Sequence, residues 1–229
     1  MKKWIEILVI VVVAVLAALP VWGFQPAGIG VSGRFSGIVP TNGDFTSAGE
    51  LNDAFDAGIT FGGQVSYTPV NYVTIVGGFD YGFMEVKDEQ KAASGNEPNV
   101  QLPQIFLKGQ FNFSSLIKNL NNRVNPYVSV GAGLYPWKIT SDGVNGDAQA
   151  FSNGEEFKKT SFGLLGSVGT EIFVIDRLSV FAEGTYHFVF AEDVDKFAGS
   201  SSGGVGTFSG FDDQGFATFG GGVTYYFPL

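Results

Sequence analysis

Apolar and polar residues alternate with period two along most of the chain, and the final stretch shows this pattern most clearly. From Phe219 to Phe227 the odd positions carry phenylalanine, valine, tyrosine or glycine, whereas the even positions carry glycine, threonine or tyrosine. A period of two is typical of a β-strand with one apolar and one polar face. The apolar face ends in Tyr225 and Phe227, and aromatic residues at a strand end favour a membrane interface.

Eight segments of the chain show this alternation, and each has roughly the 9–11 residues that a tilted strand needs to cross a bilayer. They are residues 29–37, 55–67, 73–83, 104–113, 126–137, 161–172, 179–190 and 215–227. The connections alternate in length, with long ones at 40–53, 87–99, 140–156 and 191–214 and shorter ones at 69–71, 114–124 and 175–177. The sequence therefore predicts an all-β fold, an eight-stranded antiparallel up-and-down transmembrane β-barrel with its short turns in the periplasm.

Ionisable residues occupy only one face of the predicted strands. The apolar face has essentially none in mid-strand, and the opposite face carries Arg34, Asp56, Asp80, Lys108, Glu171, Glu183 and His187. A lipid-facing Lys or Arg at the bilayer midplane costs about 2–4 kcal/mol, so we expect these residues to form a polar network inside the barrel. The lumen of an eight-stranded barrel is just wide enough for side chains. We therefore expect carboxylates to neutralise Arg34 and Lys108 in a mostly closed core.

Three aromatic residues fit this scheme less simply. Phe106 interrupts the alternation of its strand. Tyr135 and Trp137 end the strand that begins at Pro126, and aromatic residues in such a position are typical of a membrane interface. We therefore expect Tyr135 and Trp137 to face the boundary between lipid and water.

The first 23 residues have the layout of a secretory signal peptide. Lys2 and Lys3 precede an apolar run from Ile7 to Leu19, and the small residue Gly23 offers a cleavage site. The alternative is an uncleaved anchor, but the run is shorter than the roughly 20 residues of a spanning helix and is followed by Pro20. The predicted organisation is a signal peptide at 1–23 and an outer-membrane β-barrel domain at 24–229.

Composition supports this organisation and excludes several functions. The 33 glycines, 23 phenylalanines and 15% charged residues are typical of a barrel rather than of an average soluble protein. A net charge of −9 argues against nucleic acid, because phosphates require a basic surface. The chain has no cysteine, so disulfides and a lipid-anchored cysteine are excluded. With a single histidine, a metal site of His and Cys ligands is excluded as well.

Three segments carry a resemblance to a known family. They are the strand opening Pro126-Tyr127-Val128-Ser129-Val130-Gly131-Ala132-Gly133, the strand Leu178-Ser179-Val180-Phe181-Ala182-Glu183-Gly184-Thr185-Tyr186, and the ending from Gly222 to Phe227. In these segments the chain resembles the small outer-membrane β-barrel family of OmpA, OmpX and OmpW-like proteins. The resemblance implies an integral protein of the bacterial outer membrane with a structural, adhesive or minor pore function. Its implied partners are outer-membrane lipid, lipopolysaccharide and the barrel-assembly machinery.

Several apparent motifs have a simpler interpretation. Gly28, Gly30 and Gly33 spell GxGxxG, but a dinucleotide site needs a following helix within a βαβ unit. Glu183 and His187 share a strand face, yet a hydrolase also needs a serine positioned with them. The acidic long loops lack the ligand spacing of an EF-hand. We expect no catalytic residue, cofactor or metal site, and only the loops at 40–53, 87–99, 140–156 and 191–214 remain as candidates for extracellular ligands.

Two alternatives stay open from the sequence. The first is an OmpW-like porin or conduit for small solutes or ions through the lumen. The second is a soluble lipocalin-like barrel, which requires a polar exterior and an apolar interior, the reverse of the arrangement that the charges predict.

Overall fold

The computed structural model describes residues 28–46, 49–70, 72–85, 87, 97–114, 123–143, 146–149, 151–152, 155–156, 158–190 and 213–228. The expected signal peptide at 1–23 and most of the expected loop at 191–214 lie outside these residues. Among the described helical segments there is none with the length and hydropathy needed to cross a bilayer.

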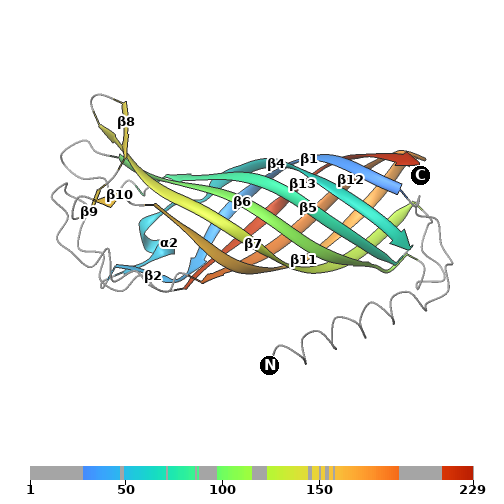
Figure 1. The fold of residues 1–229 in the computed structure, drawn as a ribbon, viewed down its shortest axis with the longest axis horizontal. Helices are drawn as coiled ribbons and strands as arrows, with labels where there is room; N and C mark the ends of the chain where they lie inside the picture. Colours follow the sequence, from blue (N-terminus) through green and yellow to red (C-terminus); the bar gives the residue numbers. More distant parts are fainter. Residues whose placement is uncertain are drawn as a thin grey trace.

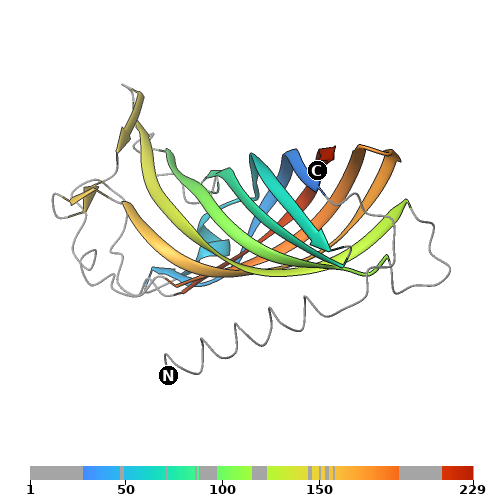
Figure 2. The ribbon, with the colours of Figure 1, turned by 45° about the vertical axis from the view of Figure 1, so that its right-hand side comes forward.

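Eight long strands form the body of the molecule. They are β1 (Gly28–Asn42), β4 (Gly58–Val70), β5 (Val73–Glu85), β6 (Glu97–Asn112), β7 (Val124–Gly143), β11 (Lys158–Ile175), β12 (Leu178–Phe190) and β13 (Gln214–Pro228). Each is antiparallel to both of its neighbours, and the β1–β13 and β7–β11 pairings close the sheet into a barrel. Figures 1 and 2 show the strands winding around a common axis. The predicted eight-stranded antiparallel up-and-down barrel is confirmed.

Short elements gather at one end of the barrel (Figure 1). They are β2 (Asp44–Thr46), β3 (Gly49–Glu50), α2 (Leu51–Ala54), β8 (Gly146–Gln149), β9 (Phe151–Ser152) and β10 (Glu155–Glu156). We call this the long-loop end, and the opposite end, where β13 finishes, the short-turn end. The expected loops at 40–53, 87–99 and 140–156 are therefore partly strand, because β1, β6 and β7 continue beyond the lengths that the alternation alone indicated.

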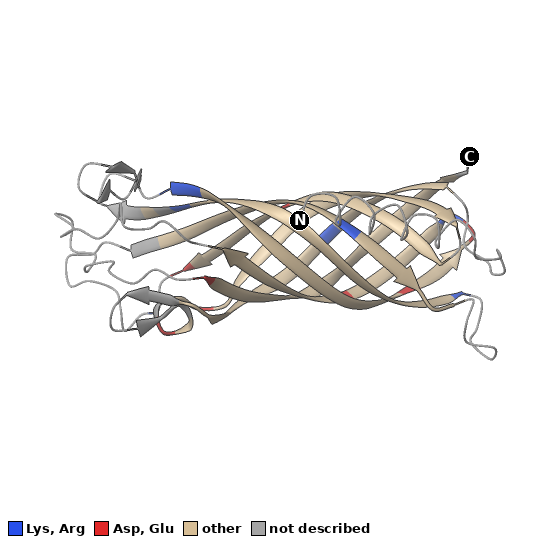
Figure 3. Cartoon of the chain, turned by 60° about the horizontal axis from the view of Figure 1, so that its bottom comes forward, with Lys and Arg blue, Asp and Glu red and all other residues tan. Residues whose placement is uncertain are grey.

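The outer surface of the barrel is apolar. Its most exposed large side chains are those of Val130, Val168, Phe219 and Leu107, at 73%, 67%, 63% and 62% exposure. Figure 3 shows that charged residues are sparse along the wall and gather mainly toward its ends. A water-exposed protein rarely carries a continuous apolar belt, so this exterior is that of a membrane-spanning barrel and excludes the lipocalin-like alternative.

Three aromatic side chains point inward. Tyr135 is fully buried and Trp137 is 6% exposed, so the prediction that they lie at the membrane interface is wrong. The cause is strand parity: Val128, Val130 and Leu134 of β7 face outward, which turns the alternate residues toward the lumen. Phe106 is likewise buried and occupies the polar parity of β6.

Candidate functional site: the barrel lumen

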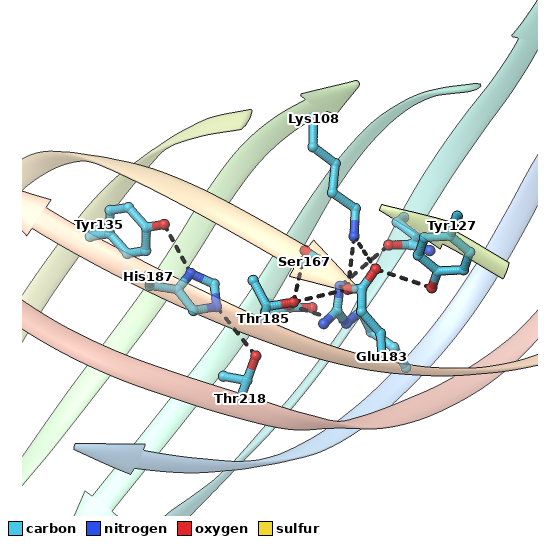
Figure 4. A network of polar contacts seen from close by, with 11 residues as sticks. Lys108, Tyr127, Tyr135, Ser167, Glu183, Thr185, His187 and Thr218 are labelled. Carbon is cyan, nitrogen blue, oxygen red and sulfur yellow. Dashed lines mark hydrogen bonds and ion pairs between the residues drawn. The ribbon is translucent and has the colours of Figure 1, made fainter. Parts of the chain in front are cut away.

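The centre of the lumen is organised around the carboxylate of Glu183 on β12 (Figure 4). Lys108 Nζ donates to both of its oxygens, at 2.8 and 2.6 Å. Arg34 Nη1 lies 3.4 Å from Glu183 Oε1. The hydroxyls of Tyr127 and Thr185 each donate to the same carboxylate, at 3.1 Å. Glu183 thus accepts from charged and neutral donors together, as a buried carboxylate requires.

A second carboxylate balances the charge of this cluster. Arg34 Nε lies 3.4 Å from Asp80 Oδ2, so the cluster of Arg34, Asp80, Lys108 and Glu183 contains two cations and two anions. All four side chains are at most 6% exposed. The ring of Phe106 lies beside both cations, with its centroid 5.6 Å from Arg34 Cζ and 5.7 Å from Lys108 Nζ. We call these four residues the ionic cluster; it supplies the neutralisation expected for Arg34 and Lys108.

Glycine stands beside each charged residue of the ionic cluster. The cross-strand partners are Gly62 and Gly222 for Arg34, Gly62 for Asp80, Gly131 for Lys108, and Gly169 and Gly220 for Glu183. A Cβ added at Gly131 would come within 2.6 Å of Lys108 Cβ and 2.3 Å of the Leu107 carbonyl oxygen. An added Cβ at Gly62 would likewise come within 2.3 Å of Asp80 Oδ1, whereas at Gly169, Gly220 and Gly222 it would meet Tyr127, Ser36 and Phe181.

Large apolar and aromatic side chains, beside the smaller buried polar groups of Ser36, Thr60 and Gln104, pack the lumen between the ionic cluster and the long-loop end. This apolar layer consists of Ile38, Met84, Leu102, Tyr135, Val189 and Phe216, all at most 5% exposed. His187 lies at its inner side, stacked on Phe216 with ring centroids 4.5 Å apart. Its ring nitrogens contact the hydroxyls of Tyr135 at 3.0 Å and Thr218 at 3.2 Å.

Hydroxyl and amide groups dominate the half of the lumen toward the short-turn end. Ser32 bonds to Thr224 at 2.9 Å and Thr68 bonds to Thr74 at 3.0 Å. Asn125 donates to Asn112 at 3.0 Å, and Asn112 donates in turn to Thr74 at 2.9 Å. These bonds tie side chains from separate strands together, so this half is a hydrogen-bonded core.

Glu171 lies in this polar half, apart from the ionic cluster. Its Oε1 accepts from Ser179 Oγ at 2.5 Å and from Tyr226 Oη at 2.7 Å. Within the described residues its carboxylate belongs to no ion pair. The two carboxylates that sequence parity placed inside the same lumen therefore differ: Glu183 is paired with cations and Glu171 with hydroxyls.

Six of the seven residues expected in the polar network face the lumen, and one does not. Arg34, Asp80, Lys108, Glu171, Glu183 and His187 are buried. Asp56 is exposed and precedes β4, which begins at Gly58. Its backbone N–H bonds to the Glu85 carbonyl at 2.9 Å, and both Asp56 and Ala57 are exposed, so strand alternation does not extend to this position. The prediction for Asp56 is wrong.

The geometry separates the residues considered for hydrolysis. Glu183 is bonded to Lys108 and Thr185, whereas His187 is bonded to Tyr135 and Thr218. Thr185 Oγ1 also lies within hydrogen-bond distance of Ser167 Oγ, at 3.0 Å, so this serine too belongs to the structural network. Within the part of the chain that the structure describes, no three His, Asp or Glu side chains gather as metal ligands do.

This combination of fold and lumen is that of a small eight-stranded transmembrane β-barrel. The structure of Neisserial surface protein A matches with a TM-score of 0.53 and 17% identity, over 89% of this chain and 100% of that one. Ail, the attachment invasion locus protein of Yersinia pestis, solved with the heparin analogue sucrose octasulfate, matches with a TM-score of 0.52 and 13% identity over the same shares. At these identities the likeness concerns the fold, and at that level it confirms the resemblance. No protein-family model and no curated protein matches the chain.

Proposed function

We propose that this chain is an integral protein of the bacterial outer membrane with a structural or surface-interaction role and a lumen closed to solutes. The observation that carries the proposal is the lumen itself. A charge-balanced ionic cluster spans its centre, and a layer of buried apolar and aromatic side chains covers that cluster toward the long-loop end. A solute would have to displace both.

The exterior supports the proposed location. Residues such as Phe35, Phe61 and Leu107 are more than half exposed on the wall of the barrel, and lipid is the solvent in which such a surface is favourable. In this proposal residues 1–23 direct export, the barrel-assembly machinery inserts the strands, and lipopolysaccharide and other outer-membrane lipids surround them.

Recognition in this proposal belongs to the long-loop end and not to the lumen. The connections 40–53, 87–99, 140–156 and 191–214 would meet extracellular ligands there. The lumen gives no support for an enzymatic role. Glu183, His187 and Ser167 are hydrogen-bonded to Lys108, Tyr135 and Thr185 respectively, and not to one another.

Planar-bilayer conductance of the refolded full-length protein tests the closed lumen. We expect no steady unitary current from the wild type. Steady currents that change when Lys108 or Asp80 is replaced by alanine would contradict a closed lumen. Heat-modifiable gel mobility in purified outer membranes tests location and fold in the same sample, and its absence there would contradict the proposed location.

The second candidate is the conduit for small solutes or ions. The observation in its favour is the polar short-turn half, which brings hydroxyl and amide groups up to the ionic cluster. Swelling of liposomes that contain the protein, in solutions of small sugars or amino acids, separates the two functions. Swelling above that of empty liposomes supports the conduit, and equal rates support the closed barrel.

A further inference from the structure

A small polar cavity lies in the short-turn half of the lumen. A water-sized particle can occupy about 20 Å³ of it, which exceeds the ~10–15 Å³ that one buried water needs. Oxygen-bearing side chains form much of its lining: Ser32, Gln64, Ser66, Glu171, Thr224 and Tyr226. The cavity therefore suits a single small particle that binds to oxygen.

The charge beside this cavity is not balanced by the protein. Glu183 has Lys108 and Arg34 as ion-pair partners. Glu171 is as deeply buried, at 4% exposure, but its partners are neutral: the hydroxyls of Ser179 and Tyr226 and the side chain of Asn125. Burying an ionised carboxylate without a cation is strongly unfavourable. Either a cation from solution accompanies Glu171 or its carboxyl is protonated.

A second observation points to a ligand in the same cavity. Ser66 is 5% exposed and lines the cavity. Its Oγ lies beside the Tyr226 hydroxyl but makes no hydrogen bond of standard geometry. A buried hydroxyl whose hydrogen bond is poorly formed costs free energy, and a bound cation would use the lone pairs of its oxygen.

The ligand set selects the kind of cation. Carboxylate, hydroxyl and amide oxygens are hard ligands, which suit hard cations. One carboxylate supplies one negative charge, so a monovalent ion leaves the site neutral, whereas a divalent ion would leave a buried positive charge. We propose that the cavity beside Glu171 binds a monovalent cation of the size of sodium.

Stability in two salts tests the site. The full-length protein is refolded into phospholipid vesicles, and its unfolding temperature is followed by gel mobility in sodium chloride and in choline chloride at equal ionic strength. We expect the unfolding temperature to rise with sodium and then saturate, because a ligand that binds only the folded state stabilises it by mass action. Choline is too large for the cavity and should have no such effect. Equal responses to both salts would overturn the proposal.

Three variants locate the effect. Glu171→Gln keeps an acceptor for Ser179 and Tyr226 but removes the charge, so the sodium response should disappear. Ser66→Ala should shift half-saturation to higher sodium concentration. Asp56→Asn removes an exposed carboxylate and should keep the full response. A sodium response that survives in Glu171→Gln would overturn the assignment to this cavity.

Infrared spectra of the wild type provide a readout that needs no variant. With sodium bound, Glu171 should contribute an ionised carboxylate band that shifts when choline replaces sodium at neutral pH. The band of a protonated carboxylic acid in sodium, unchanged in choline, would instead mean that Glu171 is neutral and that the cavity holds water, which would overturn the proposal.

Discussion

The two halves of the lumen are built from different chemistry although the same eight strands form both. Toward the long-loop end, Ile38, Leu102 and Phe216 pack into a layer with almost no exposed surface. Toward the short-turn end, Ser32 is hydrogen-bonded to Thr224 and Thr68 to Thr74. The ionic cluster lies between them. The long-loop half thus packs large apolar side chains around a few buried polar ones such as Thr60 and Gln104, whereas the short-turn half is linked by hydrogen bonds between hydroxyl and amide groups.

In the proposed closed lumen, the two halves would exclude solutes in different ways. A layer of packed apolar side chains resists ions because water does not enter it, as in hydrophobic constrictions of channels. Hydrogen-bonded polar groups resist only as long as their bonds hold. We infer that the apolar layer is the stronger barrier, and that the ionic cluster chiefly fixes the strands around it.

Removing the Glu183 carboxylate from the ionic cluster, which lies between the two halves, should lower the free energy of unfolding most. Glu183→Ala leaves Lys108 and Arg34 with Asp80 as the remaining anion of the cluster, and removing one partner of a buried ion pair costs about 3–5 kcal/mol. Urea unfolding of the barrel in phospholipid vesicles would measure this loss. Glu85→Ala, at an exposed position, is the control and should change the unfolding free energy little. A loss from Glu183→Ala as small as that of the control would show that the ionic cluster does not stabilise the fold.

Truncation in the apolar layer should rank next. Leu102 is 5% exposed, and Leu→Ala in a packed core costs about 2–5 kcal/mol through lost burial and the cavity left behind. The same unfolding assay measures Leu102→Ala. Leu107→Ala, on the outward face of the same strand and 62% exposed, is the matched control. If the two variants lose equal stability, the layer is not close-packed.

A single hydroxyl in the polar half should matter less. Ser32→Ala breaks its bond with Thr224, and a hydrogen bond between neutral groups contributes about 0.5–1.5 kcal/mol. The unfolding free energy of Ser32→Ala should therefore lie between those of Leu102→Ala and the wild type. A loss above that of Leu102→Ala would mean that the polar half, and not the apolar layer, holds the barrel together.

Asp56→Asn should have the smallest effect. Its side chain is exposed at the long-loop end, and surface substitutions usually change stability by less than about 0.5 kcal/mol. The urea midpoint should coincide with that of the wild type. A large loss would place Asp56 in a buried network after all and would revise the boundary of the lumen.

The sequence was sufficient to predict the strands, their number and most of the inward face. Period-two alternation depends on residues within one strand, so Arg34, Lys108 and Glu183 could be assigned to a face before their neighbours were known. The prediction for Asp56 was wrong because the alternation was extended to residues that precede β4, which begins at Gly58. The prediction that Tyr135 and Trp137 lie at the membrane interface was wrong because aromatic residues at a strand end suit an interface and a packed lumen equally well.

The pairing inside the lumen could not be predicted, because it depends on register between strands distant in sequence. Lys108 and Glu183 are 75 residues apart, and no local pattern fixes which carboxylate each cation reaches. For the same reason the different partners of Glu171 and Glu183 could not be predicted, because both residues lie on the inward face of their strands and are similarly buried. The strand register, together with the glycines opposite the charged residues, would have indicated both the Lys108–Glu183 pairing and the difference between the two glutamates.

The glycines beside the ionic cluster restrict how this barrel can be altered. At Gly62 an added methyl group would meet the Phe79 carbonyl oxygen at 2.1 Å, and backbone cannot move aside as a flexible side chain can. Libraries that vary all four charged positions together while holding these glycines fixed should include folded members, because replacing a whole buried ionic cluster is tolerated better than removing one partner. Libraries that vary the glycines and hold the charges should yield few, so the tolerance of the lumen to mutation is set by its smallest residues.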